Sequence, residues 1–244
     1  MRLALVLTLL AGEAWSRCAV GTYGLWSFEQ DFNDICGTYN ALSINGTALY
    51  VSSNPPPQHK VFSLSGTAVD ATMPAALSTA MSALVPWTIQ VWAWRQASRV
   101  ANNYLYGSSL IAAYGPFVQV GDDTTDNIRF DTRNASVTPL VYTAGDLRGA
   151  WHHIACVGAA SNSRLIYLDN ALVTSDTGNG THDTVDTIYI GRFGTVDTAL
   201  SSFFDQLRIS NLALASFPTI DPSGSASIFV SNGTQLNPKQ RDVH

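Results

Sequence analysis

Short apolar or alternating stretches recur along the chain, and clusters of Gly, Asn, Asp and Pro separate them. The strongest stretch runs from Trp87 to Trp94, with apolar residues at every odd position. Because Gln90, Trp92 and Trp94 point the other way and two of them are also apolar, both faces of this strand meet apolar surroundings, as in a central strand of a sandwich. The remaining predicted strands are 23–28, 60–64, 105–113, 117–120, 128–131, 140–142, 151–159, 164–168, 172–174, 187–190, 203–209 and 226–231. About a dozen strands at this spacing predict an all-β sandwich or barrel.

Turn and helix signals complete this pattern. Asp169 and Asn170 sit between two strand signals, and both residue types tolerate the positive φ of a two-residue hairpin turn. Residues 121–127 form a longer polar hairpin tip. Only residues 73–84, rich in Ala, Met and Leu, predict a helix.

The composition agrees with an all-β chain. Of the 244 residues 46% are hydrophobic, which is ample for a core, and only 13% are charged, against about 25% in typical domains. Lys and Glu, the usual residues of exposed helix faces, are nearly absent: the lysines are Lys60 and Lys239, and the glutamates are Glu13 and Glu29. A net charge of -5 argues against a nucleic-acid partner, which requires a basic face.

The N-terminus predicts export. A basic Met1-Arg2 start, a short apolar run and the small residues around Ser16 match a signal peptide over residues 1–16, cleaved after Ser16. The alternative is a first β-strand that is not cleaved. The run is too short for a membrane span, which needs roughly 20 residues. The C-terminal residues are not an apolar tail, so we expect no membrane anchor there either. We therefore expect a domain over 17–214 and a tail over 215–244 that docks on the sandwich.

Cysteines and glycosylation sequons bear on the compartment. In an oxidising compartment, Cys18 and Cys36 are expected to form a disulfide, leaving Cys156 as a buried free thiol. The alternative is three unpaired thiols in a reducing cell. Sequons occur at Asn45, Asn134, Asn179 and Asn232, which are weak evidence in a chain rich in Ser and Thr.

Several segments, in order along the chain, match motifs of one family. They are Gly24–Glu29, Phe32–Asp34, Trp87–Trp94, Trp151–Ala155, Leu165–Asn170, Ile188–Arg192 and Phe204–Ser210. Together they resemble the laminin-G-type (LamG-like) domains of the concanavalin A-like lectin/glucanase superfamily. Asn170 stands where that family usually has Gly, and Gln206 where it usually has an acid. The resemblance implies a jelly-roll sandwich of two antiparallel sheets that binds glycans or proteins, in some members with calcium.

Two groups of residues are candidate binding sites. Tyr104, Tyr106 and Tyr114 could form a platform for a sugar ring, since simple alternation places the first two on one face. The alternative is packing at a sheet edge. In the loop 121–127, Asp122, Asp123 and Asp126 could bind calcium, a hard cation that takes oxygen ligands; the alternative is a solvated hairpin tip.

The sequence argues against catalysis. Retaining glycoside hydrolases of this fold need two carboxylates about 5–5.5 Å apart, and the chain has no Glu pair at strand spacing. His152 and His153 are adjacent in a strand, point to opposite faces and cannot chelate one ion. One is expected to be packed and the other exposed.

We therefore expect a non-enzymatic, secreted binding or adhesion module that recognises glycans or glycoproteins. The alternatives are a structural protein of a virion surface, such as a phage decoration or fibre subunit, and a glycoside hydrolase. Trp92, Trp151 and Phe204 are expected to be buried where the two sheets face each other.

Overall fold

The structure is a computed structural model of the chain. It describes residues 21–28, 32–39, 42–45, 49–51, 61–64, 70–95, 104–108, 116–121, 125–132, 138–183, 187–193, 196–197, 202–217, 228–229 and 235–236. The predicted signal peptide (1–16), Cys18, and the sequons at Asn134 and Asn232 lie outside these ranges.

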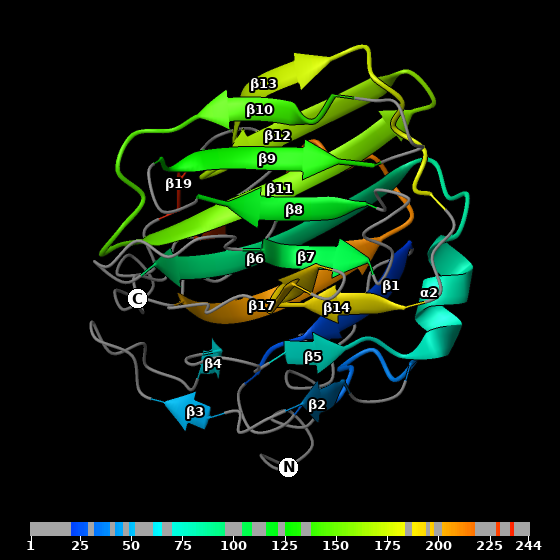
Figure 1. Cartoon of the computed structure of the whole chain (residues 1–244), viewed down its shortest axis with the longest axis vertical. Coiled ribbons are helices and arrows are strands. Elements are labelled where there is room, and N and C mark those ends of the chain that lie inside the picture. The colour runs from blue at the N-terminus through cyan, green and yellow to red at the C-terminus, as the bar shows by residue number, and fades with distance from the viewer. Residues whose placement is uncertain are drawn as a thin grey trace, which may run out of the picture.

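Two antiparallel sheets form the fold, with sheet B in front of sheet A in Figure 1. Sheet A has the order β13-β12-β11-β6-β17-β4-β3, and β1 also pairs with β17. Its strands are β1 (Thr22–Trp26), β3 (Leu49–Val51), β4 (Val61–Leu64), β6 (Trp87–Arg95), β11 (Trp151–Ala160), β12 (Ser163–Leu168), β13 (Ala171–Asp176) and β17 (Ser202–Ser210). The predicted central strand, β6, pairs with β11 on one side and β17 on the other.

Sheet B has the order β10-β9-β8-β7-β14-β5-β2. Its strands are β2 (Ser43–Asn45), β5 (Asp70–Thr72), β7 (Tyr104–Ser108), β8 (Phe117–Val120), β9 (Asn127–Asp131), β10 (Leu140–Thr143) and β14 (Ile188–Ile190). Two small ribbons pair β15 (Arg192–Phe193) with β16 (Val196–Asp197), and β18 (Ile228–Phe229) with β19 (Gln235–Leu236). The predicted helix is α2 (Ala75–Met81), shorter than expected, and it buries Leu77 and Met81. None of the described helices is long and apolar enough to cross a membrane.

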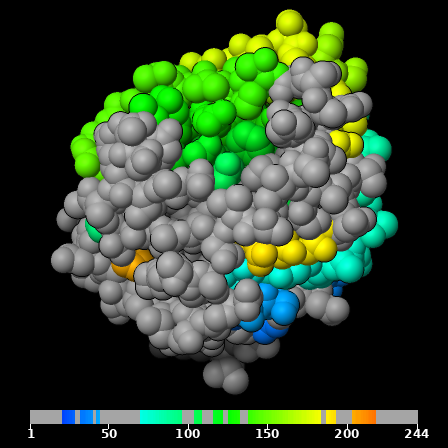
Figure 2. Space-filling view, in the orientation of Figure 1, coloured from blue at the N-terminus to red at the C-terminus, as the bar shows by residue number. Residues whose placement is uncertain are grey.

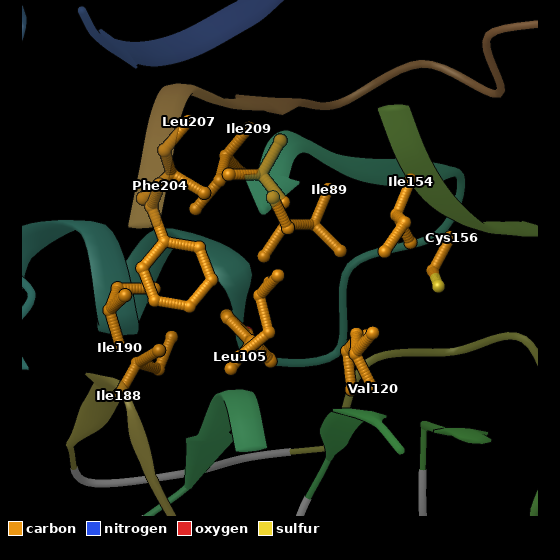
Figure 3. Packing of buried hydrophobic residues seen from close by; sticks show 14 of the residues in the cluster. Ile89, Leu105, Val120, Ile154, Cys156, Ile188, Ile190, Phe204, Leu207 and Ile209 are labelled. Carbon is orange, nitrogen blue, oxygen red and sulfur yellow. The ribbon is translucent and has the colours of Figure 1, made fainter. Parts of the chain in front are cut away.

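The hydrophobic core lies between the sheets. Figure 3 shows Ile89, Ile154 and Phe204 of sheet A facing Leu105 and Val120 of sheet B. Phe204 is therefore where the sequence predicted it. Trp92 and Trp151 are also buried, but they belong to a separate cluster on the outer face of sheet A, so their expected place between the sheets is wrong. Alternation along β6 and β11 turns these two indoles away from the core.

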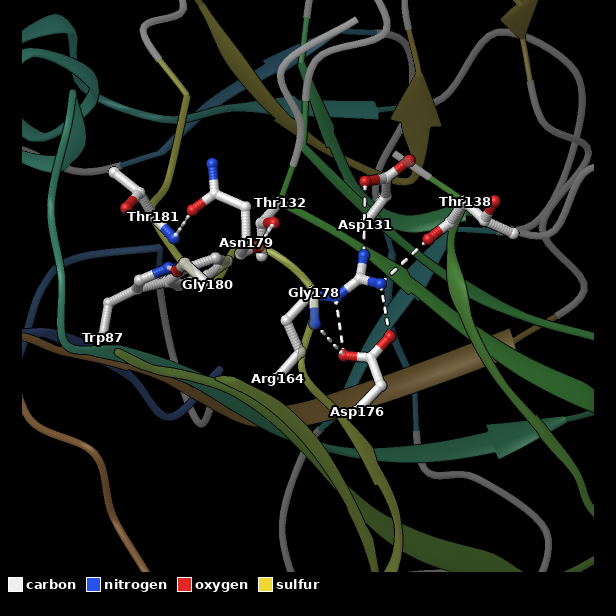
Figure 4. A network of polar contacts seen from close by, with 10 residues as sticks. All are labelled: Trp87, Asp131, Thr132, Thr138, Arg164, Asp176, Gly178, Asn179, Gly180 and Thr181. Atoms are coloured by element: carbon white, nitrogen blue, oxygen red, sulfur yellow. Dashed lines mark hydrogen bonds and ion pairs between the residues drawn. The ribbon is translucent and has the colours of Figure 1, made fainter. Parts of the chain in front are cut away.

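Buried arginines at opposite ends of the sandwich join elements of the two sheets. At one end Arg95 of β6 forms an ion pair with Asp126, just before β9. At the other end, shown in Figure 4, Arg164 of β12 bonds Asp176 and lies 3.7 Å from Asp131 of β9. Arg164 is also bonded to the Thr138 carbonyl at 2.9 Å. Both guanidiniums are almost completely buried. A buried charge needs an opposite charge beside it, so each arginine is held together with its aspartate partners.

The predicted β12–β13 hairpin is confirmed. Asp169 and Asn170 have φ values of 50° and 66°, as a two-residue turn with left-handed residues requires. The Asp169 carboxylate also accepts hydrogen bonds from the His153 backbone N–H and from His152 Nδ1, both at 2.9 Å. The turn therefore positions the start of β11 as well as joining two strands.

Candidate functional site

The outer face of sheet A carries an unusual density of aromatic residues. Phe203, Trp94 and Trp151 occupy one cross-strand row over β17, β6 and β11. In the next row Trp92 lies opposite His153. Directly paired residues share a face and lie within contact distance. We call these five residues the aromatic cluster.

Ring geometry shows a packed but incompletely covered layer. The rings of Trp94 and Phe203 are 5.2 Å apart and tilted by 31°, and those of Trp92 and His153 are 5.4 Å apart. Trp92 and Trp151 are buried, whereas Trp94 and Phe203 remain partly exposed. Trp94 and Phe203 are therefore the accessible border of the cluster.

The cluster contains polar atoms without partners. The indole nitrogens of Trp92, Trp94 and Trp151 are buried, and none makes a hydrogen bond within the described part of the chain. A buried donor left unsatisfied costs about 1–3 kcal/mol. An acceptor supplied by a bound molecule would therefore recover free energy here.

His153 is the most deeply buried member of the aromatic cluster. Its side chain is fully buried and contacts the rings of both Trp92 and Phe217, each with its centroid 5.4 Å away. Neither ring nitrogen has a hydrogen-bond partner among the described residues. Burial lowers the pKa of His153 to about 4, so the imidazole is neutral at physiological pH. His152 pairs with Ala93 and faces the other way, so the predicted opposite faces are confirmed. Its side chain is 19% exposed, so it is half-buried rather than exposed as expected.

A β-bulge adds polar groups to the same face. The register of β17 against β6 shifts between Asp205 and Arg208, and Gln206 has a φ of 52°. Bulges and positive φ at a non-glycine residue are enriched at functional sites. Asp205, fully buried, lies opposite Trp92, and Arg208 lies opposite Gln90. The bulge thus sets a carboxylate and a guanidinium beside the aromatic cluster.

The predicted tyrosine platform does not form as expected. Tyr104 pairs with Gln119 while Tyr106 pairs with Val118, so a bulge in β7 breaks the alternation and turns the two rings to opposite faces. Tyr106 is fully buried in the core, where its hydroxyl bonds His182 Nε2, so its ring is unavailable to a ligand. Tyr104 is partly exposed against Phe117. Tyr114 lies outside the described residues.

One of the three residues predicted to bind calcium has a different role in the structure. Asp126 is buried, and its carboxylate pairs with Arg95 and lies 3.9 Å from Arg148 Nε. Two guanidiniums neutralise it, so it is not a cation ligand. Asp122 and Asp123 lie outside the described residues, and among the described ones no three His, Cys, Asp or Glu side chains come together as a metal site requires.

The cysteines agree with the expected pattern as far as the structure describes them. Cys36 is disulfide-bonded, and Cys156 is a free, buried thiol in β11. Burial raises the pKa of the Cys156 thiol well above its ordinary value, which makes it unreactive.

The strand order and the two facing antiparallel sheets define a jelly-roll sandwich. The chain belongs to the concanavalin A-like lectin/glucanase superfamily, whose laminin-G-type profile matches residues 66–216. No curated protein sequence is significantly similar to the chain.

Solved structures share the fold at low identity. Domain 4 of AbnA, an extracellular GH43 arabinanase from Geobacillus stearothermophilus solved with arabinotriose, is 16% identical with a TM-score of 0.61, covering 80% of this chain and 94% of that one. A botulinum neurotoxin type C structure, described as dependent on two ganglioside molecules for cell entry, is 10% identical with a TM-score of 0.58, covering 85% and 55%. The binding domain of Paraclostridial Mosquitocidal Protein 1 is 14% identical with a TM-score of 0.58, covering 80% and 49%. The chain thus spans about half of these two toxin structures.

The sequence held one signal for the cluster that the prediction did not use. Trp92 and Trp94 share a face of β6 with the polar Gln90, whereas the other face of this strand is entirely apolar apart from the arginine at its end, so the mixed face was the better candidate for the outer one. The partners Asp205 and Phe203 come from β17, more than a hundred residues later, so only the fold brings them together.

Proposed function

We propose that this protein is a non-enzymatic, extracellular module that binds carbohydrate at the aromatic cluster. The observation that carries the proposal is the set of three tryptophans with unsatisfied indole N–H groups on one sheet face. Sugars present apolar C–H faces and hydroxyl edges, so they match aromatic rings with polar atoms close by. The bulge places the buried carboxylate of Asp205 and the buried guanidinium of Arg208 on the same face, beside these rings.

Access defines where the ligand would lie. Trp94 and Phe203 are partly exposed, so a sugar ring would first stack on this pair. Trp151 lies opposite Trp94 and is buried, so it supports the Trp94 ring rather than stacking on a sugar itself. The similarity to domains solved with arabinotriose or described with gangliosides supports saccharides as the ligand class.

The disulfide supports an extracellular location. Disulfides persist in oxidising compartments and are rare in the cytosol. Cys36 is disulfide-bonded, which favours export over the alternative of three free thiols in a reducing cell.

A glycan array followed by calorimetry tests the proposal. We expect Trp94→Ala to weaken binding of the array-selected saccharide by about tenfold or more, since loss of one ring contact costs about 1.4 kcal/mol or more. Leu172→Ala, which removes a 52% exposed apolar side chain from β13 of the same sheet, is the matched control and should bind normally. Both variants should retain the wild-type melting temperature to within a few degrees. Absence of any saccharide binding, or equal affinity of the Trp94 variant, would refute the proposal.

The same preparation tests hydrolysis. Non-enzymatic recognition predicts that the bound oligosaccharide is recovered intact after long incubation. Release of shorter sugars that disappears in Asp205→Ala would instead establish a glycoside hydrolase.

A further inference from the structure

The outer face of sheet B carries a second ordered row of side chains, on the opposite side of the sandwich from the aromatic cluster. Tyr104 of β7, Gln119 of β8, Arg129 of β9 and Val141 of β10 are successive cross-strand partners. Figure 2 looks onto this side of the molecule, where residues of β8–β10 (green) lie at the surface. We call these four residues the sheet B row.

Arg129 is the unusual member of the row. Of the six arginines in the described ranges, Arg95, Arg148, Arg164 and Arg192 each pair with an aspartate. Arg208 is buried and bonds the Thr22 hydroxyl. Arg129 is partly exposed, and among the described residues its guanidinium bonds only the side-chain oxygen of Gln119, at a long 3.4 Å. An accessible arginine that no described carboxylate pairs with is a candidate anion receptor in this chain of net charge -5.

The neighbours of Arg129 hold it in place. Gln119 is only 3% exposed, and its amide nitrogen donates to the Gly121 carbonyl at 3.4 Å, so its oxygen is turned toward the guanidinium. On the other side of Gln119, the ring of Tyr104 packs edge-to-face on Phe117 with centroids 5.6 Å apart. Tyr104 and Arg129 are therefore each held by a neighbouring side chain of the same sheet face, as a pre-organised site requires.

The spacing matches a sugar with an acidic substituent. Tyr104 and Arg129 are separated by two strand spacings, about 10 Å. An oligosaccharide ring stacked on Tyr104 would place a substituent of the adjoining ring at the guanidinium. Since the planar guanidinium fork matches a carboxylate bidentately, a carboxylate is the group that fits best.

We propose that the sheet B row is a second ligand site, one that binds carboxylate-bearing saccharides through Arg129 with stacking on Tyr104. The inference shares with the proposed function only the saccharide class of the ligand. The sheet B row lies on the opposite face of the sandwich and depends on a charged contact. A substitution can therefore abolish binding at one site and leave binding at the other unchanged.

Calorimetry with paired probes tests the site. Trigalacturonic acid and 3′-sialyllactose are the acidic probes, and the galacturonate methyl ester and lactose are their uncharged counterparts. We expect at least one acidic probe to bind at least tenfold more tightly than its counterpart, and Arg129→Gln to abolish that preference. Arg148→Gln removes the same charge from an arginine that is paired with Asp146, and it should keep the preference.

The outcomes separate the two proposals. Trp94→Ala should retain acidic-probe binding if the sheet B row is the site, even where it abolishes binding of a neutral saccharide. Equal affinity for both members of each pair, no binding of either acidic probe, or an unchanged preference in Arg129→Gln would each overturn the inference. Wild-type melting temperatures in the Arg129 and Arg148 variants establish that neither result reflects unfolding.

Discussion

The imidazole of His153 packs against the indole of Trp92 with ring centroids 5.4 Å apart, and no described residue bonds either imidazole nitrogen. A protonated imidazole would need to be hydrated or paired, and this position provides neither. His182 is fully buried in the core against Trp87, but both of its ring nitrogens are hydrogen-bonded. Its Nδ1 donates to the Asp183 carbonyl, so its Nε2 is left to accept from the Tyr106 hydroxyl.

Stability should therefore fall on acidification. Burial lowers the pKa of both His153 and His182 from 6.5 to about 4. Below pH 6.5 the unfolded chain takes up protons that the folded chain does not bind, so stability is present at neutral pH and lost as the pH falls toward 4. By pH 5 each histidine contributes a loss of about 2 kcal/mol.

Urea unfolding at pH 7 and pH 5 measures this loss. The substitution His153→Phe keeps an aromatic ring in place and removes the titrating group, so about half of the loss between the two pH values should disappear. An unchanged pH dependence in this variant would mean that His153 does not contribute to acid sensitivity.

Arg164 should be among the most destabilising positions to substitute. In Arg164→Met, the fully buried Asp131 loses its ion-pair partner and Asp176 loses two hydrogen bonds. Breaking one side of a buried ion pair typically costs about 3–5 kcal/mol. Chemical denaturation measures the change, and Arg164→Met/Asp131→Leu should recover part of it because the buried carboxylate is then removed together with the guanidinium that faces it. A double variant no more stable than the single one would show that the Asp131 charge is not the source of the loss.

Strand positions were predictable where the pattern was long. The prediction for residues 87–94 agrees with β6, and that for 151–159 with β11, because buried strands produce continuous apolar runs. Strands β2 and β5, with three residues each, were missed. Three residues contain too little alternation to distinguish a strand from a loop.

Which face of a strand points inward was harder to predict. Alternation separates Trp92 from Ile89, but only the second sheet determines which of them lies in the core. Asp126 was misjudged for a related reason. Its partner, Arg95, is 31 residues away on the other sheet, so no local pattern shows that the carboxylate turns inward.

Thiol counting tests the disulfide. In denatured, unreduced protein we expect one reactive thiol, from Cys156, because Cys36 is disulfide-bonded. Cys36→Ser should lower the free energy of unfolding by about 3 kcal/mol, the value expected for closing a loop of 15–20 residues to the predicted partner Cys18. Three reactive thiols would refute the predicted pairing. Cys156→Ala serves as the comparison, since it removes the free thiol and should leave none to count.

Gly180 should not tolerate even a methyl group. A Cβ at this position would overlap the backbone oxygens of Ala160 and Ser163, and backbone cannot move aside as a flexible side chain can. The Gly180 carbonyl also accepts the Trp87 indole N–H at 2.9 Å, a bond that joins the segment before β14 to the central strand (Figure 4). We expect Gly180→Ala to destabilise the fold by about 2–4 kcal/mol through overpacking and partial loss of this buried bond.

Gly145→Ala is the matched control, because nothing lies within 4 Å of its Cβ position and its φ is not positive. Thermal melts of the two variants should differ by many degrees, and equal melting temperatures would mean that the strand ends near Gly180 can separate at little cost.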